Sequence, residues 1–251
     1  MQSSVAMRPR WRRVERLGAE TALRAVLIAI PIVLVLVAFM LQAADYGFGA
    51  EPRGRWDLKN ERTVPAAWST LLFLMAAALM LALARADRRT GRREWRWWLG
   101  LAAVAVALGF DEFFSFHERT IEPVRDFFGT SGPLLYAWVI PGLIIFAALC
   151  LVFARFVGRM EPPLRRALVG SAALLLAGGI VMEMVGGWWA DELGINFGWM
   201  VVYTVEESLE LAGATVIVLG LLAAQKTRPR PGRPLGGSAH SARSRPNHPS
   251  P

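Results

Sequence analysis

The chain has 251 residues, of which 54% are hydrophobic, and it carries a formal net charge of +8. Its mean hydropathy is +0.37, and its charged residues lie in blocks between long apolar runs. This composition excludes an ordinary soluble globule and is typical of a multi-pass membrane protein. Cys150 is the only cysteine, which excludes an internal disulfide and a metal site built from several thiolates.

Six segments contain the roughly 20 mainly apolar residues that a helix needs to cross about 30 Å of hydrocarbon. They cover residues 22–44, 64–84, 97–117, 133–154, 167–190 and 197–224. Because strand-like alternation is scarce, we predict an all-α fold with a six-helix transmembrane bundle over residues 21–224. Pro31 and Pro141 lie inside spans and are expected to kink them. The first segment could instead be a secretory signal, but its apolar core exceeds the usual length of about 7 to 15 residues.

The basic residues predict how the chain is oriented. The Lys and Arg residues are concentrated in an N-terminal arm (1–20), in two loops (85–96 and 155–166) and in the C-terminal tail (225–251). This asymmetry places both termini in the cytoplasm, with the chain in a bacterial-type inner membrane. The tail is rich in Pro, Gly, Ser and Arg and is predicted to be disordered. Because the arginines flank spans and form no folded basic face, we expect the lipid bilayer as a partner and no nucleic acid.

Six acidic residues fall within the predicted spans, where each costs at least about 2 to 3 kcal/mol at the membrane centre. They are Asp111, Glu112, Glu183, Glu206, Glu207 and Glu210. Counting about 1.5 Å of rise per residue from the nearest interfacial aromatic residue puts all six between the midplane and the outer surface. Since they come from the third, fifth and sixth spans, we expect them to line one pocket that opens to the outside.

The segment GFDEFFSFHERT, residues 109–120, ends the third span. At about 100° per residue, a continuing helix places Asp111, Ser115, Glu118 and Glu122 on one stripe and points His117 well away from it. The phenylalanines are expected to cover the other faces of this helix; they are Phe110, Phe113, Phe114 and Phe116.

Clustered carboxylates repel one another unless some are protonated or a cation lies among them. Oxygen ligands with at most one histidine favour Mg, Mn, Ca or Fe over zinc. The predicted metal ligands are Asp111, Glu112, Glu118, Glu183, Glu206, Glu207 and Glu210, and the predicted catalytic residues are His117 and Ser115. Three alternatives stay open: hydrated acids at a helix end, pairing of the acids with loop arginines, and a permanently protonated acid.

Known catalytic motifs do not fit. GTSG at residues 129–132 is similar to the GxSG of rhomboid proteases, but no later span contains a histidine to act as base. The Asp, Ser and His near one helix end resemble the alkaline ceramidase and progestin-receptor-like hydrolases. That family uses several histidines on different helices, whereas this chain has one in its membrane part, so no residue role is carried over.

Three classes of function therefore remain. The first is a metal-dependent enzyme that acts on an outer-leaflet, lipid-linked or small-molecule substrate, with His117 or a carboxylate moving protons. The second is a proton- or cation-coupled transporter that uses the same carboxylates. The third is a non-catalytic subunit of a membrane complex. We place the enzyme first, because the six spans show no obvious inverted repeat. The sequence predicts no oligomeric state.

Overall fold

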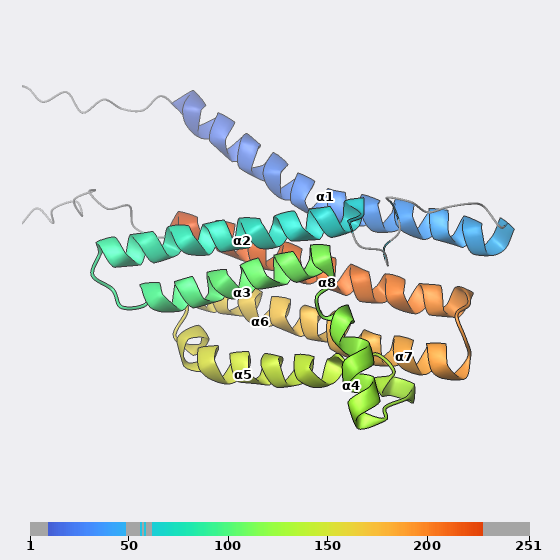
Figure 1. Ribbon diagram of the computed structural model, residues 1–251. Helices are drawn as coiled ribbons and strands as arrows, with labels where there is room; N and C mark the ends of the chain where they lie inside the picture. The colour runs from blue at the N-terminus through green and yellow to red at the C-terminus, as the bar shows by residue number, and fades with distance from the viewer. Residues whose placement is uncertain (1–9, 49–55, 57, 59–61, 228–251) are drawn as a thin grey trace, which may run out of the picture.

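A computed structural model describes residues 10–48, 56, 58 and 62–227, and every helix, contact and count below refers to these residues. They form a helical bundle without strands (Figure 1). The helices are α1 (Arg10–Phe48), α2 (Val64–Arg89), α3 (Trp95–Phe114), α4 (Ile121–Phe128), α5 (Val139–Gly158), α6 (Pro162–Leu176), α7 (Glu183–Glu192) and α8 (Phe197–Thr227). Short 3₁₀ turns are η2 (Glu118–Thr120) and η3 (Gly132–Leu134), and a π-helical turn, η4 (Ala177–Met182), joins α6 to α7.

The predicted all-α fold class is confirmed over this part of the chain. Six of its helical segments are long and apolar enough to cross a membrane. They are Gly18–Tyr46, Val64–Arg89, Trp95–Phe114, Val139–Gly158, Pro162–Glu192 and Phe197–Lys226. Each overlaps one predicted span, so long apolar runs were a sufficient guide to the number of helices.

Two of the sequence predictions differ from the structure, at Pro141 and at the start of the tail. Pro141 is the third residue of α5, where a missing N–H leaves no helical bond unmade, so it does not kink the middle of a span as expected. Pro31 does lie inside α1, which bends in its middle (Figure 1). The predicted tail begins inside α8, where Gln225 donates to the Leu79 carbonyl at 3.2 Å and Lys226 pairs with Glu20. The rest of the tail, and its predicted disorder, lie outside the described residues.

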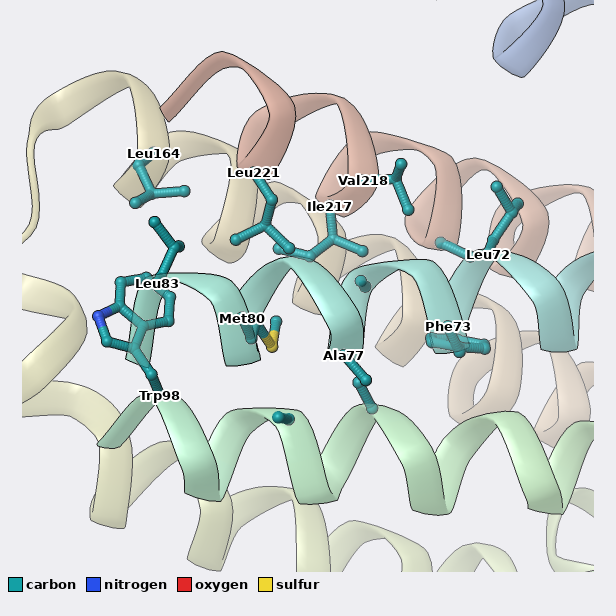
Figure 2. Packing of buried hydrophobic residues seen from close by; sticks show 14 of the residues in the cluster. Leu72, Phe73, Ala77, Met80, Leu83, Trp98, Leu164, Ile217, Val218 and Leu221 are labelled. Carbon is teal, nitrogen blue, oxygen red and sulfur yellow. The ribbon is translucent and has the colours of Figure 1, made fainter. Parts of the chain in front are cut away.

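The hydrophobic core is centred on α2, which packs against α3 on one side and α8 on the other (Figure 2). In Figure 2, Met80 and Ala77 of α2 lie between α3 and the Ile217 side of α8. Helix α6 also packs against α8. Trp98 closes the core at one end and donates from Nε1 to Asp87 at 3.0 Å.

Small residues allow these helices to approach one another closely. A Cβ on Gly109 of α3 would lie 3.1 Å from Phe73 of α2, and one on Gly213 of α8 would lie 2.9 Å from Leu175 of α6. The Ser171 hydroxyl also donates to the Gly213 carbonyl at 2.8 Å. Close backbone contact of this kind is the usual way in which apolar helices associate where burial from water supplies no driving force.

Candidate metal centre

Three glutamates from two helices meet near one end of the bundle. Glu112 lies in the last turn of α3, and Glu207 and Glu210 lie three residues apart on α8, so that both project to one side of that helix. One carboxylate oxygen from each residue lies within 4.8 Å of the other two, and all three residues are half-buried. We call these three residues the glutamate cluster. It is the convergence of the third and sixth spans that the sequence predicted.

The π-helical turn η4 forms a wall of the glutamate cluster. A Cβ on Gly179 would lie 2.6 Å from Oε1 of Glu210, and one on Gly178 would lie 2.7 Å from its Cγ and 2.9 Å from the Glu206 carbonyl oxygen. Only glycine therefore lets η4 approach the Glu210 side chain this closely. π-Helical turns occur frequently at functional sites, because the extra residue shifts the side chains that follow it.

Two further acidic residues, which we call the acidic pair, lie beside the glutamate cluster. Glu183 begins α7, and its carboxyl group lies beside that of Glu206 of α8. Trp138, just before α5, donates from its ring Nε1 to Oε1 of Glu183 at 3.2 Å. The charges of Glu183 and Glu112 also act on Glu210, so the pair and the cluster form one electrostatic unit.

The loop between α3 and α5 supplies further polar groups. Its η3 turn is fixed to α7 by the Gly132 N–H, which donates to Asp191 at 2.6 Å. This contact holds Tyr136 next to the acidic pair. Burial and the negative charge of Glu183 raise the pKa of Tyr136 to about 12, so its hydroxyl keeps its proton at neutral pH.

The His117 side chain points toward the acidic residues, whereas the sequence predicted that it would point away from them. Helix α3 ends at Phe114, and Ser115 takes a left-handed backbone conformation with φ of 43°, while its N–H still donates to the Asp111 carbonyl at 2.7 Å. The chain then reverses, and Nδ1 of His117 lies 2.7 Å from Oδ2 of Asp111. The His117 N–H donates to Oδ1 of the same carboxylate at 3.0 Å. The predicted helix through residue 117, with His117 pointing away, is therefore wrong.

The His117 ring is held between a carboxylate and an indole. Its centroid lies 4.4 Å from that of Trp138. Burial of the ring opposes protonation, but the hydrogen bond and charge of Asp111, helped by Glu183 and Glu118, prevail and raise the pKa of His117 above its ordinary value. The ring thus connects Asp111 of α3 to the acidic pair through Trp138.

The predicted stripe of Asp111, Ser115, Glu118 and Glu122 does not form, because α3 ends before three of its members. Ser115 is buried at the reversal, whereas Glu118 in η2 and Glu122 in α4 are exposed. The structure thus brings together most of the predicted ligands; they are Asp111, Glu112, Glu183, Glu206, Glu207 and Glu210. Glu118 acts on this group through its charge at His117.

The phenylalanines of this segment stack on one another, away from the cluster. The Phe114 ring stacks with Phe110 at 6.1 Å and with Phe116 at 5.6 Å between centroids. Phe110 and Phe116 are about half exposed. The Arg119 guanidinium lies 5.0 Å from the centroid of Phe116 and donates to the Phe114 carbonyl, which caps the end of α3. The aromatic side chains therefore lie on the outer faces of this helix, as expected.

Sequence reasoning missed three residues of the site. Ser69 of α2 is fully buried and interacts with Glu112, and the only signal for it was a polar residue within an apolar span. Trp138 and Tyr136 lie in the segment that was predicted to begin the fourth span, at residues 133–154. The structure instead begins α5 at Val139 and leaves both residues in the loop that faces the acids.

Taken together, the described fold and the acidic site define an all-helical bundle, compatible with a multi-pass membrane protein, that carries a carboxylate cluster near one end. Residues 16–224 match a family described as a domain of unknown function, DUF8692, and the chain belongs to that family. No curated protein and no solved structure matches the chain.

Proposed function

We propose that the protein is a multi-pass membrane protein that binds a divalent cation between Glu112, Glu207 and Glu210. The observation that carries the proposal is the approach of three carboxylate oxygens from α3 and α8 to within 4.8 Å of one another. Three negative charges this close and partly buried would be stabilised by a shared cation. Ser69, buried beside Glu112, offers a further oxygen.

The ligand chemistry selects the class of ion. The cluster offers oxygen atoms alone, which suit hard cations, and a lone histidine does not make a zinc site. Calcium binds oxygen at about 2.3 to 2.6 Å and magnesium at about 2.0 to 2.1 Å. The three cluster oxygens lie within 4.8 Å of one another, so all three can reach one hard cation of this group.

An enzymatic role for the ion is the favoured activity. A divalent cation polarises a bound carbonyl or phosphoryl oxygen and lowers the pKa of a bound water. His117, whose Nδ1 lies 2.7 Å from Asp111, would accept a proton from a bound water or a substrate hydroxyl, as histidine commonly does near neutral pH. The raised pKa of His117 helps the ring to retain that proton until a leaving group takes it.

The orientation belongs to the same proposal. The basic arm, the two basic loops and the basic tail support cytoplasmic termini in a bacterial-type inner membrane. The glutamate cluster then lies in the outer half of the bilayer, because Glu112 is in the last turn of α3, and Glu207 and Glu210 are in the half of α8 away from its basic flank. Its substrate is accordingly a molecule of the outer leaflet or the outer aqueous phase.

A proton-coupled transporter is the second candidate. The observation that favours it is the Glu183 and Glu206 pair, whose carboxyl groups lie beside each other. Intramembrane acidic pairs of this kind serve as proton relays in transporters. Uptake of a cation into liposomes that follows an imposed pH gradient would favour this alternative over the enzyme.

Elemental analysis of purified protein tests the proposal. We expect about one divalent cation per chain in the wild type, and loss of that cation in Glu210→Gln, which keeps the size of the side chain but removes its charge. Glu192→Gln is the matched control, because Glu192 is an exposed acid at the end of α7. Folded wild-type protein that holds no divalent cation, even after incubation with calcium, would refute the proposal.

A further inference from the structure

An apolar cavity lies between the helices on the side of the glutamate cluster that faces the middle of the bundle. It has a volume of about 130 Å³ and is lined by residues of α2, α3, α6 and α8 with almost no polar surface. A cavity of similar size lined by Leu, Ile and Phe stays free of water and binds benzene. The cavity therefore has room for a small piece of hydrocarbon, and water gains little by entering it.

On each helix that lines it, the cavity lies about two helical turns from the glutamate cluster and on the same face of the helix. On α3, the lining residue Ala105 precedes Glu112 by seven residues, and on α8, the lining residue Ile217 follows Glu210 by seven residues. Seven residues make about two helical turns, so each pair lies on one face of its helix and about 10 Å apart. Two helices thus present the same pattern, with a carboxylate at the upper level and an apolar side chain at the lower one.

The other two walls repeat this relation. On α2, the lining residue Ala76 follows Ser69 by seven residues, and Ser69 interacts with Glu112. On α6, the lining residue Ser171 precedes Gly178 by seven residues, and Gly178 lies against Glu210. The upper end of the cavity, at Leu175, is only one turn from this glycine. All four walls therefore continue from the cavity to the cluster.

The cavity opens to the surface of the bundle, and α5 leaves it uncovered. Helix α5 touches the bundle at its two ends, through Gly142 against Ile180 and through Phe153 against Trp97 and Gly100. Between these contacts, residues 143–152 include no buried side chain, and α5 contributes no residue to the lining. The hydrocarbon chain of a lipid in the bilayer can therefore enter the cavity between α3 and α6 without any helix moving out of its packed position.

We propose that this cavity holds part of one hydrocarbon chain of a lipid with a phosphate head group, and that the phosphate binds at the glutamate cluster. The proposal rests on the proposed function, since the divalent cation supplies the contact to the phosphate. Ala76 lies half-way along α2, so the chain runs from the outer site toward the middle of the bilayer, the direction of an outer-leaflet lipid.

Photolabelling with phosphatidic acid that carries a diazirine at the end of one acyl chain tests the proposal in nanodiscs. We expect wild-type protein to be labelled on cavity residues such as Met80 and Leu101, as mapped by mass spectrometry. Ala172→Phe fills the cavity and should abolish this labelling, whereas Ala173→Phe, at the exposed neighbouring position, should leave it unchanged. Labelling that is equal in all three proteins would show contact with bulk lipid alone and overturn the proposal.

A measurement on the wild type avoids dependence on the folding of Ala172→Phe. Unlabelled phosphatidic acid should compete with the cavity label, and uncharged diacylglycerol at the same mole fraction should not, because it lacks the phosphate. Equal competition by both lipids would overturn the head-group assignment. The metal content of the same preparation separates the two proposals, since bound cation without cavity labelling refutes the chain pocket and leaves the metal site intact.

Discussion

Replacing Gly179 by alanine tests whether the Glu210 carboxylate takes part in metal binding. The new Cβ would lie 2.6 Å from Oε1 of Glu210, whereas ordinary contacts begin at 3.4 Å, so the carboxylate oxygen must move by about 0.8 Å. Metal-ligand distances vary by only about 0.2 Å around their preferred values. We therefore expect Gly179→Ala to weaken the binding of the divalent cation about 10- to 100-fold, the range seen when the support of a ligand is removed.

Gly170 provides a control for this experiment, and Gly178 a comparison. A Cβ on Gly170 of α6 meets nothing within 4 Å, so Gly170→Ala should bind the cation like the wild type. A Cβ on Gly178 would lie 2.9 Å from the Glu206 carbonyl oxygen, which belongs to the backbone and cannot rotate away. Gly178→Ala should therefore destabilise the bundle by about 1 to 3 kcal/mol. Calcium titration by calorimetry measures the affinities, and equal affinity in Gly179→Ala and Gly170→Ala would refute the reasoning.

Two further predictions concern the loop after α3 and the orientation of the chain. Because Asp111 raises the pKa of His117, the ion pair stabilises the fold fully below about pH 6.5, and this contribution is lost as the pH rises through the folded-state pKa. The melting temperature should fall over that interval in the wild type but not in Asp111→Asn; parallel profiles would contradict the assignment. In a Cys150→Ser background, Ser131→Cys should react with a membrane-impermeant maleimide on intact cells and Arg92→Cys should not; the reverse pattern would invert the topology.

Much of the site was predictable because charged residues are rare in apolar helices. Glu183, Glu206 and Glu210 were chosen from the sequence for that reason alone, and counting the helical rise correctly placed them at similar levels. The prediction failed at the end of α3. A periodic pattern assumes that the helix continues, and nothing in the sequence signals that Ser115, with φ of 43°, ends it.

The turn η4 shows a second limit of sequence reasoning. Its paired glycines, Gly178 and Gly179, predicted close packing of helices in general, but the sequence did not say which side chain they approach. The structure places them against Glu210, and that contact decides where the carboxylate points. The role of Ser69 has the same origin, because a serine within α2 becomes significant only when Glu112 lies beside it.

The sequence alone determined the number of long apolar helices in the described part of the chain, their approximate limits and the levels of their acidic residues, because hydropathy and helical rise are properties of each segment. Only the tertiary structure decided that Glu112, Glu207 and Glu210 meet, that His117 folds back onto Asp111, and that an apolar cavity continues from the cluster. These features depend on the rotation of each helix about its own axis. That rotation is set by contacts between segments far apart in the chain, such as glycine against glutamate, and the pattern within one segment does not contain it.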